Sequence, residues 1–242
     1  MITEKYNTDK QLFKIEKYHN DDNVYFSVYS NCPLSNVLKN GEIYEPHLHK
    51  IFEKYINKES IVIEGGCHIG SHSVKLSKLA KILYCFEPLP ESNKLLKKNL
   101  LINDCINVIV SNYGLSDSIS KTKFGWIPLG NIGGSGLIDN PMGKPEWIEN
   151  DEDNVDVELI TIDSLNLDKL DFIKLDVEGY ESKVINGALN TIKKFRPIIT
   201  VECWSDHYGN IDVEYTKNNF NMLIDINYTL KHVKSSDWLF LP

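Results

Sequence analysis

Short apolar runs alternate along the chain with stretches in which apolar residues recur every three or four positions. The runs are short and continuous, which predicts parallel strands buried on both faces. We expect such strands at residues 61–63, 82–86, 106–110, 155–162, 172–175 and 198–201, and a closing antiparallel pair at 222–226 and 238–241. Strands that alternate with helices indicate an α/β fold.

The amphipathic stretches predict the helices. Apolar residues from Leu48 to Ile56 follow the helical period, and Pro46 suits the first turn of that helix. Further helices are expected from Ser71, from Pro90 and across residues 184–192. Each of the last three follows a predicted strand, as in successive βαβ units.

The most informative stretch runs from Ser60 to Pro88. A buried strand ends in Glu64 and a glycine cluster, and the next strand ends in Glu87, roughly twenty residues later. Gly66 and Gly70 allow backbone angles that other residues avoid, and leave space for a ligand against the main chain. This βαβ unit is typical of a nucleoside site.

The residue sequence of the loop narrows the range of possible ligands. It lacks G-x-G-x-x-G, and no lysine follows its last glycine, so neither phosphate-binding motif fits. S-adenosylmethionine, which carries a sulfonium and an amino acid but no phosphate, suits the loop, and Glu87 would accept hydrogen bonds from both ribose hydroxyls. The alternative is an ordinary βαβ turn with a surface glutamate.

Other strand ends carry polar residues to the same rim of the sheet. Asn112, Ser116 and Asp117 follow the third strand, and one of them is a candidate partner of the adenine amine, although a turn-rich strand exit explains them equally well. Asp176 and Glu202 end two further strands. Since carboxylates repel one another, their convergence with Glu64 and Glu87 favours a cationic ligand, either the sulfonium donor or a divalent metal.

We expect an N-terminal extension over residues 1–40 and one catalytic domain over residues 41–242. Residues 121–152 interrupt the alternation with many glycines and prolines, which predicts a substrate loop at the active rim. Within it, Trp126 and Trp147 either stack on a sugar or pack in the interior.

Composition narrows the class of partner. The formal net charge of −8 disfavours nucleic acid as the acceptor. Five scattered cysteines without a C-x-x-C pair indicate a reduced, cytoplasmic protein with no zinc site, and the sequence shows neither a signal peptide nor a membrane-spanning run. The oligomeric state is left open.

Several segments together resemble the FkbM-type family of S-adenosylmethionine-dependent methyltransferases. They are residues 63–70, Phe86–Pro88, Asp163–Leu165, 171–181 with its D-V-E-G-x-E motif, and 197–202. The resemblance implies a Rossmann-like class I methyltransferase with a seven-stranded, mostly parallel sheet, helices on both faces, and O-methylation of a small acceptor such as a sugar or glycan.

The resemblance also implies a cofactor site. Its expected residues are Tyr44, Glu45, Glu64, Gly66, His68, Gly70, Glu87 and Asp176, together with Asn112, Ser116 and Asp117 after the third strand. Glu64 stands where the family usually has aspartate, and His68 where it usually has asparagine. We therefore expect altered contacts to the methionine part of the cofactor.

For catalysis we hypothesise that Asp176 lies beside the methyl group, with Glu202 or His207 as base or second carboxylate ligand. If a metal takes part, Asp176 and Glu202 would hold Mg²⁺. Glu178 and Glu181 either join this cluster or hold Lys174 or the helix that follows. The competing hypotheses are a nicotinamide-dependent sugar oxidoreductase and an idle methyltransferase fold that serves as a binding subunit.

Overall fold

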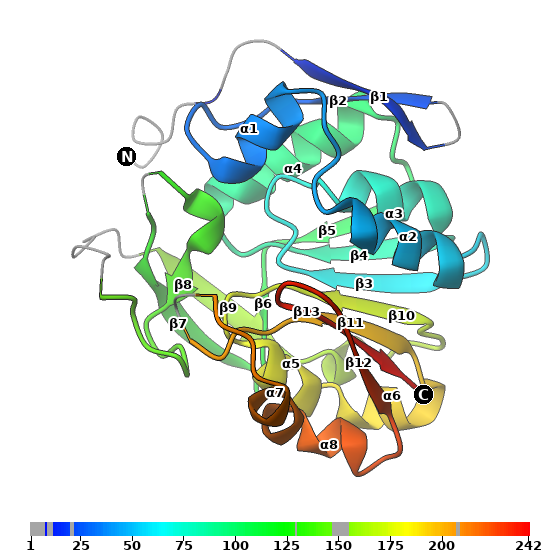
Figure 1. Cartoon of the computed structure of the whole chain (residues 1–242), viewed down its shortest axis with the longest axis vertical. Coiled ribbons are helices and arrows are strands. Elements are labelled where there is room, and N and C mark those ends of the chain that lie inside the picture. The colour runs from blue at the N-terminus through cyan, green and yellow to red at the C-terminus, as the bar shows by residue number, and fades with distance from the viewer. Residues whose placement is uncertain (1–7, 9–11, 20–21, 129, 147–154, 207–208) are drawn as a thin grey trace.

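The computed structural model describes residue 8 and residues 12–19, 22–128, 130–146, 155–206 and 209–242 of the 242-residue chain. Within these residues a seven-stranded sheet forms the centre of the molecule (Figure 1). Its strand order is β12 (Thr229–Lys234), β13 (Asp237–Leu241), β11 (Ile198–Glu202), β10 (Phe172–Leu175), β3 (Ile61–Gly65), β4 (Ile82–Phe86) and β5 (Val108–Ser111). The strands from β11 to β5 are parallel, and β13 is antiparallel to both of its neighbours.

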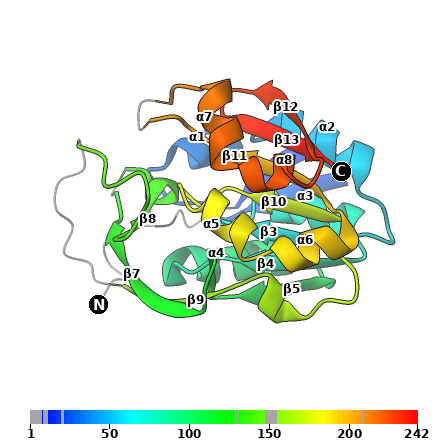
Figure 2. The same ribbon diagram turned by 90° about the horizontal axis from the view of Figure 1, so that it is seen from below.

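Helices cover both faces of this sheet, as the alternating pattern predicted (Figures 1 and 2). On one face lie α2 (Pro46–Tyr55), α3 (Ser73–Leu79) and α4 (Pro90–Ile102), and on the other α5 (Glu181–Asn186) and α6 (Leu189–Phe195). The expected stripes are buried: α2 contributes Leu48 and Phe52, and α4 contributes Leu95, Leu96, Asn99 and Leu100. The Rossmann-like, mostly parallel α/β fold is confirmed.

Three expected elements differ from the structure. The segment 222–226 is not a strand, because Phe220 and Leu223 are buried at helical spacing next to α7 (Val213–Asn219) and within α8 (Asn221–Ile224). The helix expected across 184–192 breaks at Gly187, whose carbonyl accepts a hydrogen bond from the Asp163 amide at the start of the 3₁₀ turn η2 (Asp163–Leu165). The helix expected from Ser71 begins two residues later, at Ser73.

Residues 121–152, the expected substrate loop, contribute two strands to a second sheet beside the carboxyl ends of the central strands, and their role in binding a substrate stays a prediction. The strand order of this sheet is β6 (Gly114–Leu115), β9 (Asp156–Ile160), β7 (Ser120–Trp126) and β8 (Gly136–Leu137), and the short 3₁₀ turn η1 (Ile132–Gly134) precedes β8. Residues 147–154 lie outside the described part of the chain, and with them Trp147. Trp126 is buried, and its indole N–H donates to the Gly134 carbonyl at 3.1 Å, so it packs inside this sheet.

The N-terminal segment packs on the same core. The strands β1 (Phe13–His19) and β2 (Asp22–Phe26) form a hairpin near α3 and α4, and α1 (Pro33–Lys39) follows (Figure 1). Ile15, Val24 and Phe26 have no exposed surface and belong to the core of the whole molecule. No helix in the described residues combines the length and apolar character needed to cross a membrane.

Asn99 of α4 ties this segment to the core. Its amide donates to the carbonyls of Ser27 and Ile69 at 2.9 and 2.8 Å, and its oxygen accepts from the Ser27 amide at 2.8 Å. Since the side chain is fully buried, its loss leaves three backbone groups unpaired.

We predict that Asn99→Ala lowers the free energy of unfolding by roughly 2–4 kcal/mol. Lys97→Ala, at an exposed site on the same helix, is the matched control and should change stability by less than about 0.5 kcal/mol. Urea unfolding followed by circular dichroism measures both. Equal stability of the two variants would show that the Asn99 contacts do not hold the segment in place.

Candidate active site

Four neighbouring strands deliver a carboxylic acid to the same rim of the central sheet. In strand order these acids are Glu202, Asp176, Glu64 and Glu87, at the ends of β11, β10, β3 and β4. They line a cavity of about 290 Å³ at the carboxyl ends of the strands. The convergence expected from the sequence is present, at the place where open α/β sheets bind ligands.

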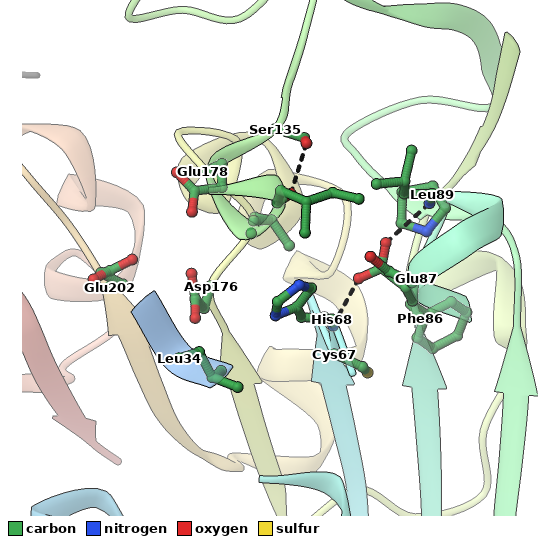
Figure 3. A pocket seen from close by; sticks show the side chains of 18 of the residues that line it. Leu34, Cys67, His68, Phe86, Glu87, Leu89, Ser135, Asp176, Glu178 and Glu202 are labelled. Atoms are coloured by element: carbon green, nitrogen blue, oxygen red, sulfur yellow. Dashed lines mark hydrogen bonds between the residues drawn. The ribbon is translucent and has the colours of Figure 1, made fainter. Parts of the chain in front are cut away.

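The cavity has two chemically different ends (Figure 3). The carboxyl groups of Asp176, Glu178 and Glu202 gather at one end, Glu87 lies at the other, and the His68 ring stands between them. The Trp204 side chain lines the cavity as well.

The glycine loop after β3 forms the cavity floor. Gly66 has a φ of +75°, and a Cβ atom there would lie 1.5 Å from the Asp176 carbonyl oxygen. No other residue fits, because β3 and β10 are adjacent strands and the loop crosses directly over the end of β10. Glycine therefore lets the loop pack against the end of β10, and Gly66 also lines the cavity.

Glu87 is held in one orientation by the main chain. Its two carboxylate oxygens accept hydrogen bonds from the His68 amide at 2.7 Å and the Leu89 amide at 2.9 Å. Burial raises the pKa of Glu87 to about 7, against the opposing effect of these two amides. Each oxygen keeps a further lone pair for a ligand hydroxyl.

Glu64 is 1% exposed and still lines the cavity. One of its oxygens accepts from the Ser73 hydroxyl at 2.6 Å, and the other has no hydrogen-bond partner among the described residues. A buried carboxylate oxygen without a partner is costly, so this atom is suited to accept a hydrogen bond from a bound ligand.

His68 adopts a left-handed conformation, with φ of +47°, and its ring stacks on Tyr29 with 5.7 Å between the ring centres. Burial lowers the pKa of His68 to about 4, although Asp176 acts in the opposite direction. The imidazole is therefore neutral near pH 7.

Lys174 neutralises the centre of the acidic rim. It is 3% exposed on β10, and its ammonium donates to an Asp176 oxygen at 3.1 Å. Burial alone would raise the pKa of Asp176, but Lys174, together with Glu202 and His72, outweighs burial and holds this pKa below its usual range. Asp176 is thus ionised at the end of a buried strand.

Asp176, Glu178 and Glu202 form a carboxylate cluster, in which one oxygen from each lies within 4.8 Å of the others. Burial, followed by repulsion from Asp176, raises the pKa of both Glu178 and Glu202 well above the usual range. The Ser236 hydroxyl donates to Glu202 at 2.8 Å. Glu181 stays outside the cavity and accepts from the amides of Val177 and Gly179 at 2.7 and 3.1 Å, which confirms its structural role at the start of α5.

Seven of the expected site residues line the cavity, and they are Tyr44, Glu64, Gly66, His68, Glu87, Asp176 and Glu202. His207 lies outside the described residues, so its role stays a prediction.

Glu45 and Gly70 support the site from outside the cavity lining. A Glu45 oxygen lies 2.9 Å from Nε2 of His72, which does line the cavity. Gly70 has a φ of +88° in the turn before α3, where a Cβ atom would lie 2.7 Å from a Leu96 methyl carbon. Both residues position the cavity wall.

The residues proposed for the adenine amine do not line the cavity either. The chain leaves β5 at Ser111 and enters β6, which pairs with β9 of the second sheet, and this turn carries Asn112, Ser116 and Asp117 away from the rim. Asn112 and Asp117 are exposed, and the Ser116 hydroxyl donates to Asp117 at 3.3 Å. Gly114 and Leu115 of β6 line the cavity in their place.

Trp204, Lys174 and His72 line the cavity as well. Sequence reasoning assigned no role to Trp204, although it follows the strand-ending Glu202 by two positions. Lys174 is the one charged residue within an apolar strand, and the structure pairs it with Asp176.

Three features are typical of Rossmann-like enzymes that bind a nucleoside. They are the strand order of this mostly parallel sheet, the glycine loop after β3 and the acid at the end of β4. The family model of the methyltransferase FkbM domain matches residues 65–232. The chain belongs to this family of S-adenosylmethionine-dependent methyltransferases, and the oxidoreductase hypothesis is therefore wrong.

Two curated relatives are methyltransferases. Methyltransferase sdnD of Sordaria araneosa is 26% identical over 194 residues, which are 67% of this chain and 73% of the relative. The hexuronic acid methyltransferase AglP of Haloferax volcanii is 26% identical over 144 residues, 59% of this chain and 55% of AglP. The match thus spans only about half of AglP.

A solved structure of an FkbM methyltransferase from Methylobacillus flagellatus shares the fold. Its TM-score is 0.51 at 14% identity, and the match covers 80% of this chain and 50% of that one. At this identity the similarity supports the fold alone.

Glu87 leads to a testable pH dependence. Because its pKa is raised to about 7, the carboxyl is protonated below that pH and ionised above it. If the ionised form accepts both ribose hydroxyls, the affinity for S-adenosylmethionine rises with pH, by up to about tenfold per unit below 7, and then levels off. Calorimetry on the wild type and on Glu87→Gln measures this. The variant should bind weakly with a flatter pH profile, and equal profiles would assign the titration to another group.

Proposed function

We propose that this protein transfers the methyl group of S-adenosylmethionine to a hydroxyl of a small acceptor, a sugar or glycan. The single observation that carries the proposal is the division of the cavity, with an oriented Glu87 at one end and the cluster of Asp176, Glu178 and Glu202 at the other. The name of AglP, a hexuronic acid methyltransferase, supports a sugar acceptor.

The residues present suit the cofactor. Glu87 would accept hydrogen bonds from the ribose hydroxyls, and Gly66 leaves the main chain accessible beside it. The unpartnered Glu64 oxygen would accept from the ammonium of the methionine part. When bound, the cofactor supplies an electrophilic methyl group on a positively charged sulfur.

The acidic cluster would handle the acceptor hydroxyl. Asp176 stays ionised beside Lys174, so it can accept a hydrogen bond from the hydroxyl and orient its oxygen. Its low pKa makes it a weak base. Glu202, whose pKa is raised, is the stronger proton acceptor once it is ionised, and we assign it the role of general base.

A nucleic acid acceptor fits this cavity poorly, since its phosphates would approach a concentration of carboxylates in a chain with net charge −8. The cytoplasmic location expected from the scattered cysteines stays a prediction.

Asp176→Asn keeps the size of the side chain and removes its charge. We predict a loss of at least about 100-fold in kcat with the fold intact, because the hydroxyl is no longer oriented by an anion and Lys174 loses its partner. Methyl transfer is followed as S-adenosylhomocysteine formed in the presence of the acceptor. Asp168→Asn, at an exposed position outside the cavity lining, is the control. Normal turnover by Asp176→Asn would remove this residue from the mechanism.

A Mg²⁺-assisted version of the reaction would use oxygen ligands from Asp176 and Glu202, with Glu178 nearby. Lys174 already supplies a cation to Asp176, so we expect the reaction to proceed without a metal. Turnover should change by less than about twofold after treatment with EDTA. Loss of activity that Mg²⁺ restores would establish the metal-assisted version.

The idle-subunit hypothesis is tested by the same measurements. It predicts no heat of binding with S-adenosylmethionine or S-adenosylhomocysteine and no methyl transfer. The proposed enzyme binds both compounds.

A further inference from the structure

We infer that the acceptor sugar carries no carboxylate and is a neutral or amino sugar, unlike the hexuronic acid in the name of AglP. This inference rests on the proposed function, because it concerns the acceptor end of the same cavity. It follows from the charged side chains that the described residues place at that end of the cavity.

The cavity is lined by many acidic side chains and few basic ones. Among the described residues, its acids are Glu64, Glu87, Asp176, Glu178 and Glu202. Lys174 is the one lysine or arginine in this lining, and its ammonium is already bonded to Asp176. His68 is neutral because burial lowers its pKa to about 4, and Nε2 of His72 lies 2.9 Å from a Glu45 oxygen. Within the described part of this lining, a sugar carboxylate would find no free cation.

Arginine is the residue best suited to bind a carboxylate, because its guanidinium donates two parallel hydrogen bonds. Arg196 is the only arginine in the 242-residue chain. It follows α6 and precedes β11, at the amino end of that strand, whereas the cavity lies at the carboxyl ends. Its guanidinium donates to the Ile226 carbonyl at 2.6 Å and lies over the Tyr228 ring. The chain therefore uses its arginine to hold α6 against the C-terminal segment.

The acceptor end instead offers hydrogen-bond acceptors. The oxygens of Asp176, Glu178 and Glu202 suit hydroxyl and ammonium donors, and Trp204 adds an aromatic surface to the lining. Burial, followed by repulsion from Asp176, raises the pKa values of Glu178 and Glu202. A protonated amine between these two side chains would relieve the repulsion, whereas a carboxylate would increase it. The buried, unpartnered oxygen of Glu64 adds a further acceptor to this lining.

The test compares sugars of the same ring configuration that differ in charge at C2 or C6. Methyl glycosides of gluco, galacto and manno configuration are each assayed as the neutral sugar, the 2-amino sugar and the uronate, with S-adenosylmethionine as donor and the full chain as enzyme. We expect kcat/KM for the uronate to be at least about tenfold below that of the neutral or amino sugar of the same configuration. Comparable or preferred turnover of a uronate would overturn the inference and leave the proposed function in place.

Methyl transfer to none of the nine sugars, with the cofactor still bound in calorimetry, would count against the sugar acceptor itself. The inference would fail together with that part of the proposed function. The two failures are therefore distinguishable.

A variant tests whether the carboxylate cluster sets the preference for the neutral sugar over the uronate. Glu178→Gln removes an ionisable carboxyl group at the acceptor end and, at a pH where that group is ionised, should narrow the ratio between neutral sugar and uronate by about threefold or more. Glu158→Gln, on the exposed face of β9 beside Lys121, removes a carboxylate outside the cavity lining and should leave the ratio unchanged. An equal ratio in both variants would show that Glu178 does not set the preference.

Discussion

The buried ion pair between Lys174 and Asp176 is the interaction on which the rest of the site depends. Four neighbouring strands end in acids, and five carboxyl groups line one cavity, an arrangement whose repulsion needs a compensating charge. Lys174 supplies that charge from inside the sheet, next to β3 and β11, where water does not reach it. Burial, reinforced by repulsion from the Asp176 anion, raises the pKa values of Glu178 and Glu202. One cation thus contributes to a difference in pKa between Asp176 and its two neighbours in the cluster.

Much of the fold could be predicted because parallel strands leave a strong signal. Runs such as Ile61–Ile63 and Ile82–Phe86 are continuous and apolar, and glycines or acids mark their ends. The same rule placed Glu64, Glu87, Asp176 and Glu202 on one rim, since carboxyl ends of parallel strands share an edge. The apolar run at 222–226 carried no such marker. Its short length is compatible with either a strand or a helix, and tertiary packing of Phe220 and Leu223 selected the helix.

The details of the site were less accessible to sequence reasoning. Asn112, Ser116 and Asp117 follow a strand, as binding residues do, but the direction of the chain after β5 depends on pairing with β9, some forty residues away. The roles of Glu45 and Glu181 also depend on geometry: one contacts His72 and the other accepts hydrogen bonds from backbone amides. Residue type and spacing identify the rim of the sheet, whereas contacts between distant segments decide which side chains face the cavity.

The N-terminal hairpin has a consequence for how this protein can be divided. The family match begins at residue 65, the last residue of β3, although the Tyr18 hydroxyl donates to the Ser71 carbonyl and Lys75 donates to the Tyr18 carbonyl at 3.3 Å. Ile15, Val24 and Phe26 are fully buried against the same interior. The autonomous folding unit is therefore larger than the stretch that homology recognises. A truncation placed at the homology boundary would remove all but the last residue of β3, an inner strand of the sheet, and strip one side of the molecule of its cover.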